Sequence, residues 1–218
     1  MKRTREPLTV DRILRAALAL ADEGGLESLS MRRIASRLGV QAMSLYNHVA
    51  NKEEIIDGLV ETVVAEFAPP DVADEWKTAL RLRATSAHES LLRHPWAIMA
   101  LMTRTTAGPA KLRYVDATIG CLVRAGFSYE TADRAWNAMD NHIYGFTLQE
   151  VNFPFEPPEY ADSAREFLPQ VATERFPYFT ELATRVMDGR YSGLHDFEFG
   201  LNLILDGLER YRDVDGER

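Results

Sequence analysis

The stretch SRLGVQAMSLYNHVANKEEI, residues 36–55, decides how this chain folds, because it places one tight turn between two apparent helix starts. Gly39 supplies the left-handed or tight backbone that ends the preceding helix. Asn51 is a good N-cap, and Glu54, three residues later, completes a capping-box-like pair with it. The pattern predicts a short third helix near residues 41–48 and a fourth helix that begins after Asn51.

Two further helices are predicted before the turn. Apolar residues recur there at the spacing of one helix face, at Val10, Ile13, Leu14, Ala17 and Ala21. Thr9 is placed to cap this first helix, and the pair Gly24-Gly25 is placed to end it. Ser30 is placed to cap the second helix. Two helices that join through a short glycine-containing turn inside a three-helix unit form a helix-turn-helix.

Helical spacing recurs along the rest of the chain, and alternating strand patterns are almost absent, which predicts an all-α fold. The stretch APPDVAD is the best candidate for a domain boundary. We therefore expect a helix-turn-helix domain with its connecting fourth helix over residues 1–67, and a larger helical domain over residues 68–218. Proline-rich residues 152–163 are expected to form a loop. Later helices are expected at residues 74–93, 95–102, 109–125, 128–152, 162–188, with interruptions at Pro169 and Pro177, and 195–212.

Composition limits the class of protein. Apolar residues make up 46% of the 218 residues, which is enough for a sizeable core. The sequence contains no run of 18 apolar residues, so a membrane-spanning helix is not expected. The N-terminal stretch MKRTREPLTV has basic residues but no apolar segment behind them, so a secretory signal is not expected. The single cysteine, Cys121, excludes an intramolecular disulfide and indicates a reducing cytoplasm.

Charge is distributed unevenly along the chain. The formal net charge is −8, yet the first 52 residues hold nine lysines and arginines against five acids. The remaining residues hold sixteen basic side chains against twenty-eight acidic ones. A basic N-terminal segment on an acidic remainder keeps one surface attractive to phosphate.

The predicted third helix offers a surface for reading double-stranded DNA. Val40, Leu45 and Val49 are predicted to face the core. The side chains left outward are those that a major groove accepts, namely Gln41, Ala42, Met43, Ser44 and Asn47. Tyr46, His48 and Lys52 are expected at the far edge, where their O–H and N–H groups suit phosphate oxygens. Arg32 and Arg33, in the second helix, are further candidates for contact with DNA.

The segment LSMRRIASRLGVQAMSLYNHVANKEEIIDGL, residues 29–59, resembles the N-terminal domain of the TetR family of bacterial transcriptional regulators. The resemblance is carried by Leu38-Gly39-Val40, Leu45-Tyr46, His48-Val49 and Asn51-Lys52. Three later stretches, RHPW (93–96), AGFS (125–128) and FEFGLNLILDGLE (197–209), resemble the C-terminal domain of the branch that contains tetracycline repressors. The resemblance implies an all-helical homodimer that binds a palindromic operator, and whose C-terminal domain typically binds a small-molecule effector that releases the DNA.

A candidate effector site is built from residues at helical spacing in the C-terminal region. Its walls are expected to be Trp96, Met99, Met102, Trp136, Met139 and Phe146, although core packing remains open for each of them. Asp140 and His142 are the polar candidates. A buried carboxylate is costly unless paired, so Asp140 either pairs with Arg113 or Arg134 or recognises a ligand. We expect a mostly apolar effector with a polar or cationic group.

Catalysis and bound metal are not expected. No Ser-His-Asp, paired-carboxylate or cysteine-histidine arrangement is identifiable, and His88, His94 and His195 lack metal-ligand spacing, so no catalytic residue, metal or cofactor is predicted. The alternative is a helical small-molecule-binding or catalytic protein whose N-terminal helices are structural only.

The helices near residues 128–152 and 195–212 are expected to form the dimer interface. The last helix carries one apolar stripe, and Gly200 and Gly207 flank Leu203 there, which would let a partner helix approach closely. The alternative for this stripe is that it closes the core of a single copy. The stripe consists of Phe197, Leu201, Ile204, Leu208 and Tyr211.

Overall fold

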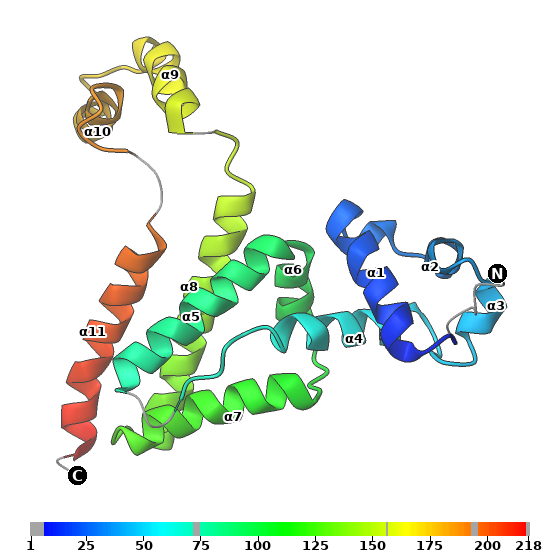
Figure 1. Cartoon of the computed structure of the whole chain (residues 1–218). Helices are drawn as coiled ribbons and strands as arrows, with labels where there is room; N and C mark the ends of the chain where they lie inside the picture. The colour runs from blue at the N-terminus through cyan, green and yellow to red at the C-terminus, as the bar shows by residue number, and fades with distance from the viewer. Residues whose placement is uncertain (1–6, 72–74, 156, 193–195, 217–218) are drawn as a thin grey trace. The chain divides into compact units, whose positions relative to one another are not determined.

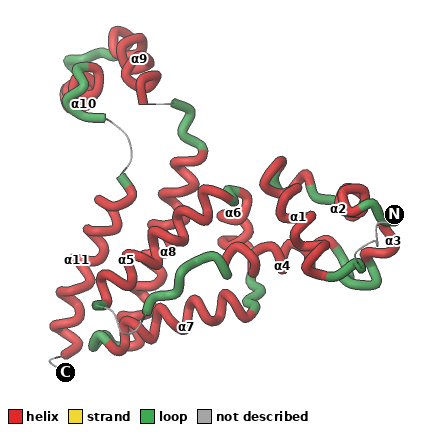
Figure 2. The backbone as a smooth tube through the Cα atoms, viewed as in Figure 1, coloured by secondary structure: helices red, strands yellow, loops and turns green. Residues whose placement is uncertain are grey.

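The computed structural model describes residues 7–71, 75–155, 157–192 and 196–216, and every regular element in those ranges is helical, as Figure 2 shows. The predicted all-α fold is confirmed. The α-helices are α1 (Val10–Gly24), α2 (Met31–Leu38), α3 (Ala42–Leu45), α4 (Lys52–Val64), α5 (Trp76–Arg93), α6 (Trp96–Thr103), α7 (Pro109–Arg124), α8 (Tyr129–Val151), α9 (Pro157–Phe167), α10 (Pro177–Met187) and α11 (Phe197–Gly216). Short 3-10 turns lie at Leu26–Ser28 and Leu168–Gln170.

The chain divides into two compact units. One comprises residues 1–151 and 200–218, and the other comprises residues 152–199. The first contains α1–α8 and most of α11, whereas the second contains α9 and α10, which pack on each other. This division into two compact units does not test the domain boundary that the sequence predicts at residues 68–74, so that boundary stays a prediction. Among the described residues, no helix combines the length and apolar character needed to cross a bilayer.

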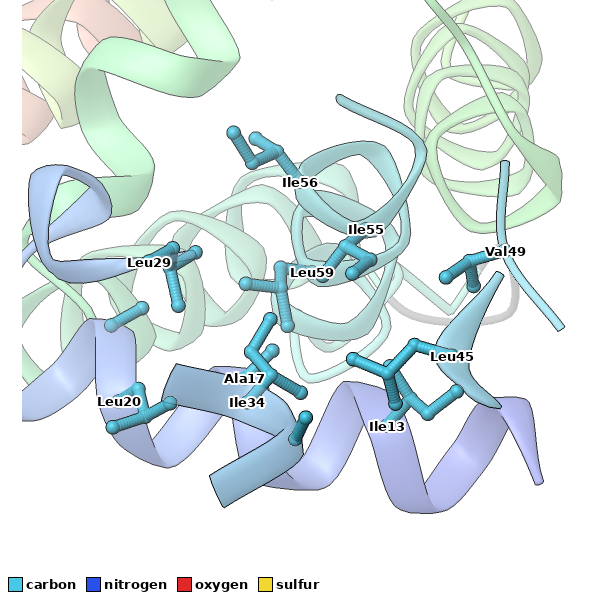
Figure 3. Close-up of a cluster of buried hydrophobic side chains, with 12 residues drawn as sticks. Ile13, Ala17, Leu20, Leu29, Ile34, Leu45, Val49, Ile55, Ile56 and Leu59 are labelled. Carbon is cyan, nitrogen blue, oxygen red and sulfur yellow. The ribbon is translucent and has the colours of Figure 1, made fainter. Parts of the chain in front are cut away.

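The first three helices and the start of α4 share one apolar core, drawn in Figure 3. Ile13, Ile34, Leu45 and Leu59 come from four different helices and are fully buried. Burial of each such side chain contributes about 1.5–3 kcal/mol relative to exposure. This core therefore fixes the short helix α3 against α1, α2 and α4.

Local sequence signals set the helix starts, as predicted. The Thr9 hydroxyl accepts a hydrogen bond from the N–H of Arg12, and the Asn51 side chain accepts one from the N–H of Glu54 at 2.9 Å. The Glu54 carboxylate in turn accepts from the N–H of Ala50, the residue before the N-cap, so the pair differs from a capping box, in which the N–H of the N-cap itself is the donor. Ser30 caps α2 in the same way.

Helix α4 connects the N-terminal helices to the rest of the first unit (Figure 1). We call α1–α3 the head and α5–α8 the body. The first half of α4 buries Ile55 and Ile56 in the head core, and its second half buries Val60, Val63 and Val64. Helices α5 and α7 both pack on α8, and α7 also packs on α4. A single helix therefore contributes to the core of the head and to the packing of the body.

Two expected boundaries are wrong. The expected loop over residues 152–163 ends early, because α9 begins at Pro157. Proline lacks an N–H, but the first residues of a helix need none, so proline is well tolerated there. The third helix is shorter than predicted: α3 ends at Leu45, and a turn runs through residues 46–48.

Candidate nucleic-acid interface

The turn between α2 and α3 sets the position of α3. Gly39 adopts φ 66° and ψ 35°, the left-handed conformation that favours glycine. The N–H of Val40 then donates to the carbonyl of Ala35 at 3.0 Å, which reverses the chain. Leu45 and Val49 are 0% and 4% exposed, so α3 and the residues after it are anchored on the head core.

The side chains predicted to read DNA lie on and just after this anchored helix. Met43 is 74% exposed and Tyr46 is 47% exposed. Gln41, Asn47 and His48 are exposed as well, and Ala42 and Ser44 are half-buried. The structure thus leaves the predicted polar groups available at the surface while the apolar residues between them hold the backbone.

The arginines of α2 differ in what they contact. Arg32 and Arg33 are both exposed, and Arg33 donates to the carbonyl of Ser28 at 3.0 Å. Arg37 forms a two-bond pair with Glu23, with distances of 2.7 and 2.8 Å. Both side chains are exposed, so solvent screens the ion pair and it ties Arg37 to α1 only weakly.

Lys52 has a structural contact that sequence reasoning did not anticipate. Its half-buried ammonium donates to the carbonyl of Leu26 at 3.1 Å, which links the first residue of α4 to the turn after α1. An ammonium has three N–H groups, so this bond leaves donors for a phosphate.

Acidic side chains of α4 bind basic and polar groups of the loop after α6. The guanidinium of Arg104 donates to Asp57 at 2.5 Å and to Glu53 at 2.9 Å, and the hydroxyl of Thr106 donates to Asp57 at 2.8 Å. The hydrogen bond from Arg104 lowers the pKa of Asp57 although partial burial opposes this. Asp57 therefore stays ionised and keeps α4 attached to the loop.

One turn further along α4, Glu61 caps the start of α7. Its carboxylate accepts from the backbone N–H groups of Ala110 and Lys111 at 2.7 and 3.2 Å. An acid at a helix N-terminus is favourable because these N–H groups have no partner within the helix. A Cβ atom at Gly108 would overlap the Glu61 carboxylate, which would have to move from its present position at the start of α7.

The end of α4 and the end of α1 meet at a buried histidine. His94 Nδ1 lies 2.7 Å from Asp22, and its Nε2 lies 3.3 Å from Glu66. Trp96 also donates to Asp22, at 2.8 Å, and Arg93 donates to Glu66 at 2.7 Å. Burial raises the pKa of Glu66, but hydrogen bonds from Arg93 and Ser90 together with the nearby His94 lower it by more, so the pKa lies below its usual value. The head is thus joined to the body through α1 as well as through α4.

A buried polar cluster lies in the body around Asp140. The carboxylate accepts from the guanidinium of Arg83, from Trp136 Nε1 at 2.8 Å, and from the hydroxyls of Tyr144 and Tyr114 at 3.1 and 3.4 Å. Burial raises the pKa of both tyrosines, so they remain protonated donors. Four donors therefore converge on one carboxylate.

The partner of Asp140 was not predicted correctly. The expected pairing with Arg113 or Arg134 is wrong, because Arg83 makes the ion pair and is fully buried. A signal for this existed in the sequence, since Arg83 falls within the buried face of α5 between Leu80 and Ala87. Its guanidinium also stacks on the ring of Tyr114, 4.3 Å from the ring centroid.

The other predicted effector residues lie in different surroundings. Trp96 contacts the head through Asp22, and Met99 and Met102 are 51% and 56% exposed. Met139 is fully buried within α8. The structure therefore brings Trp136 to Asp140 but does not bring the three residues of α6 to it, because α6 presents them to α1 or to solvent.

His142 and Phe146, the last two predicted effector residues, pack together on α8. Their ring centroids are 5.5 Å apart, and the Phe146 ring also meets that of His88 at 5.8 Å. A side chain at Gly200 would clash with His142, which shows that α8 and α11 approach closely here.

Besides a hollow of about 370 Å³ bordered by Asp11, Leu14, Arg15, Leu18 and Thr62, two further cavities lie among the described residues. One, of about 150 Å³, lies between the end of α4 and α7 and is bordered by Val64, Phe67, Pro69, Ala110, Arg113 and Tyr114. The other, of about 270 Å³, lies within the second unit between α9 and α10 and is bordered by Tyr160, Phe167, Phe179 and Leu182 among others. In the part of the chain that the structure describes, no three His, Cys, Asp or Glu side chains could hold a metal ion together.

Comparison with known families assigns both parts of the chain. Residues 13–59 match the family described as bacterial regulatory proteins, tetR family, and residues 68–212 match the tetracyclin repressor-like C-terminal domain. The matched ranges include the head with most of α4, and the body with α9–α11.

Individual relatives agree with this assignment. The chain is 30% identical to the transcriptional repressor DrrR1 of Streptomyces coeruleorubidus, covering 93% of this chain and 77% of the relative. It is 31% identical to the class C tetracycline repressor of Escherichia coli, covering 92% and 90% of the two chains. Among solved structures, ActR of Streptomyces coelicolor superposes with a TM-score of 0.80 at 27% identity, over 95% of this chain and 98% of that one. ActR in complex with actinorhodin gives 0.78 at 29% identity, over 94% and 98%.

Proposed function

The chain belongs to the TetR family of bacterial transcriptional regulators, and on that premise we propose that it is a cytoplasmic homodimeric repressor that a small-molecule effector releases from a palindromic operator. Members of this family bind DNA and are not enzymes, which removes the alternative of a catalytic protein with a merely structural head. The proposal assigns DNA contact to the head and effector binding to the body.

The observation that carries the proposal is the exposure of polar side chains directly before and after the anchored helix α3. Gln41, Ser44 and Asn47 are candidates for base contact, and Tyr46 and His48 are candidates for phosphate contact. The helix contains no arginine or lysine, and one four-residue helix reads few base pairs. Useful specificity therefore requires two copies of α3 on a two-fold symmetric site.

Support for a dimer comes from the exposed faces of α8 and α11. Leu201, Leu205 and Leu208 are buried within one copy, so part of the apolar stripe of α11 closes the core of the protomer. Leu203 is 62% exposed on another face, and a side chain at Gly207 would meet nothing within 4 Å. A large apolar residue beside an uncovered glycine suits close packing against a second copy.

Effector release is proposed to act through α4. Glu53 and Asp57 attach this helix to Arg104, and Glu61 attaches it to the start of α7. Glu66, two residues beyond the end of the helix, accepts from Arg93. A ligand that displaces these partners tilts the helix and thereby the head, which changes the spacing of the two reading helices. A hundredfold loss of operator affinity corresponds to a coupling of about 2.7 kcal/mol. ActR, which has been solved with actinorhodin, supports a small molecule as the effector.

A mobility-shift titration against the DNA upstream of the chain's own coding sequence tests the proposal. We expect a saturable complex with an inverted repeat, much weaker binding to one half-site, and affinity that falls steeply with salt. A protein that bound the inverted repeat no better than random duplex would contradict the assignment as a sequence-specific regulator.

A further inference from the structure

The cavity of about 150 Å³ between the end of α4 and α7 is bordered by one arginine, Arg113. The other described residues that border this cavity are apolar or aromatic. Arg113 is exposed, whereas Val64, Phe67 and Tyr114 are only 3%, 3% and 5% exposed. The cavity therefore combines buried apolar walls with a cationic group where it opens to solvent.

The guanidinium of Arg113 is available to a ligand. It makes no hydrogen bond or ion pair with any residue that the structure describes. Glu61, the acid of α4 at this contact, is engaged with the backbone N–H groups of Ala110 and Lys111. A guanidinium binds a carboxylate through two parallel hydrogen bonds, which adds geometric specificity to the attraction of opposite charges.

We propose that this cavity binds the effector, and that the effector is an aromatic carboxylate whose ring fills the cavity and whose carboxylate pairs with Arg113. The inference rests on the proposed function, because it names the chemical class of the molecule that releases the DNA. It replaces the expected cationic group with an anionic one. Asp140, the acid that a cation would contact, already accepts from four donors.

The walls of the cavity suit one aromatic ring. An apolar cavity of about this volume holds a benzene ring. Phe67 and Tyr114 meet edge-on in the wall, with ring centroids 5.3 Å apart, and aromatic rings attract a further ring in edge-to-face or offset-stacked geometry. Tyr114 is itself fixed, because its hydroxyl donates to Asp140 and its ring stacks on Arg83. A wall that is ordered before the ligand binds loses little conformational freedom on binding.

The cavity lies at the contact that joins α4 to the body. Val64 is the last residue of α4, and Phe67 follows it, whereas Ala110 and Tyr114 belong to α7. Glu61, one turn before Val64, joins the same two helices. A ligand in the cavity therefore displaces the end of α4 relative to α7, and α4 transmits the displacement to the head.

Benzoate and benzamide are the probes, because they have nearly the same shape and differ in charge. Titration of the full-length ¹⁵N-labelled protein, followed by amide chemical shifts, gives both dissociation constants. We expect benzoate to bind about fivefold more tightly than benzamide, as befits a two-bond charged pair that solvent partly screens. The shifts should centre on residues 64–69 and 110–114, which contain the border of the cavity. Acetate carries the carboxylate without the ring and should not produce these shifts.

Two arginine variants of α7 identify the cationic partner. Arg113→Met removes the guanidinium and keeps an apolar chain beside the cavity, so the affinity ratio of benzoate to benzamide should fall to about one. The variant should fold, because Arg113 is exposed and holds no other described residue. Arg124→Met removes an exposed arginine at the other end of α7 and should leave the ratio unchanged.

Operator affinity is measured on the same samples at equal concentrations of sodium benzoate and sodium acetate, because salt alone weakens binding to DNA. Saturation of the wild type with benzoate should lower operator affinity by about tenfold relative to acetate. In Arg113→Met the two salts should act alike.

Equal affinity of the wild type for benzoate and benzamide, or chemical shifts centred away from the cavity, would overturn the inference. So would a ratio that survives in Arg113→Met or is lost in Arg124→Met, and so would saturation by benzoate without a change in operator affinity. Any of these results in a protein that binds its operator refutes only the inference, whereas a protein without operator binding refutes the proposed function.

Discussion

At the scale of single residues, the segment after α3 contains side chains that build the head and side chains that stay exposed on its surface. Val49 is buried and Lys52 donates to the carbonyl of Leu26, so both hold the head together. Tyr46 and Asn47 are exposed. Lys52→Ala would therefore remove a structural bond together with any phosphate contact, and a change in DNA binding could not be assigned to either one.

Tyr46 and Asn47 give a cleaner separation of roles. Tyr46→Phe removes one hydroxyl from a proposed phosphate contact, so affinity should fall by about fivefold on operator and random DNA alike. Asn47→Ala removes a proposed base contact and should cost about 1–3 kcal/mol on the operator only, with altered sequence preference. Fluorescence anisotropy with operator and scrambled duplexes measures both. Equal losses for the two variants on the two DNAs would refute this division of roles.

His88 should make stability depend on pH. Burial lowers its pKa from the ordinary value of 6.5, although the neighbouring Glu150 opposes the shift. The unfolded chain therefore binds a proton near pH 6.5 while folded His88 remains neutral. The contribution of His88 to the free energy of unfolding is therefore fully present above pH 6.5. It is lost as the pH falls through the pKa that His88 has in the folded protein.

Urea unfolding of wild type and His88→Gln between about pH 5 and about pH 7.5 tests the effect of this histidine. The wild type should lose more stability on acidification than the variant, by at most about 1.4 kcal/mol per pH unit. The other histidines are present in both proteins and cancel in the comparison. Parallel pH profiles would show that the buried imidazole does not titrate differently on folding.

At the scale of elements, α4 is held to the body by polar contacts as well as by packing. Arg104 binds the acids of its first turns, and the N-terminus of α7 binds Glu61. Each contact joins α4 to a different segment of the body. These contacts consequently fix both the rotation of α4 about its axis and its position along that axis. An apolar interface alone would constrain the rotation and the position less.

The approach of α7 to α4 depends on Gly108. Gly108→Ala places a methyl group against the Glu61 carboxylate and should destabilise the protein by about 1–3 kcal/mol. Gly120→Ala is the matched control within α7, since its methyl group meets nothing within 4 Å, and it should stabilise the helix by about 0.5–1 kcal/mol. Chemical denaturation of both variants measures the difference. Equal effects at the two glycines would mean that α7 does not sit closely on Glu61.

Local signals in the sequence predicted the head well and the interior of the body poorly. Thr9, Ser30 and Asn51 act on neighbours three residues away, so their capping could be read directly. Asp140 binds Arg83, which is 57 positions distant, and pairing at that separation depends on how α5 and α8 pack. The contact of Trp96 with the head depends on tertiary packing in the same way.

At the scale of the whole molecule, the exposed residues of α11 predict assembly of two copies. Leu203→Arg puts a charge on its exposed face, where it meets water in a monomer but would be buried in the proposed dimer. We expect folded monomers with much weaker operator binding. Leu112→Arg, at a residue 59% exposed on α7, is the control and should remain dimeric.

Analytical ultracentrifugation with circular dichroism distinguishes loss of assembly from loss of folding in these variants. A dimer that persists in Leu203→Arg, and also in Leu203→Arg combined with Gly207→Arg, would place the interface elsewhere on the protein.

The carboxylates of α4 also limit how such regulators can be recombined. A chimera that replaces the head must supply an acid at position 22 for His94 and Trp96, and acids at positions 53 and 57 for Arg104. A graft that ends between the head and α4 retains the last two acids but exchanges the first. A new head is therefore compatible only if it keeps these three carboxylates. A donor without an acid at position 22 would leave Trp96 without its acceptor and His94 with Glu66 in place of two acids.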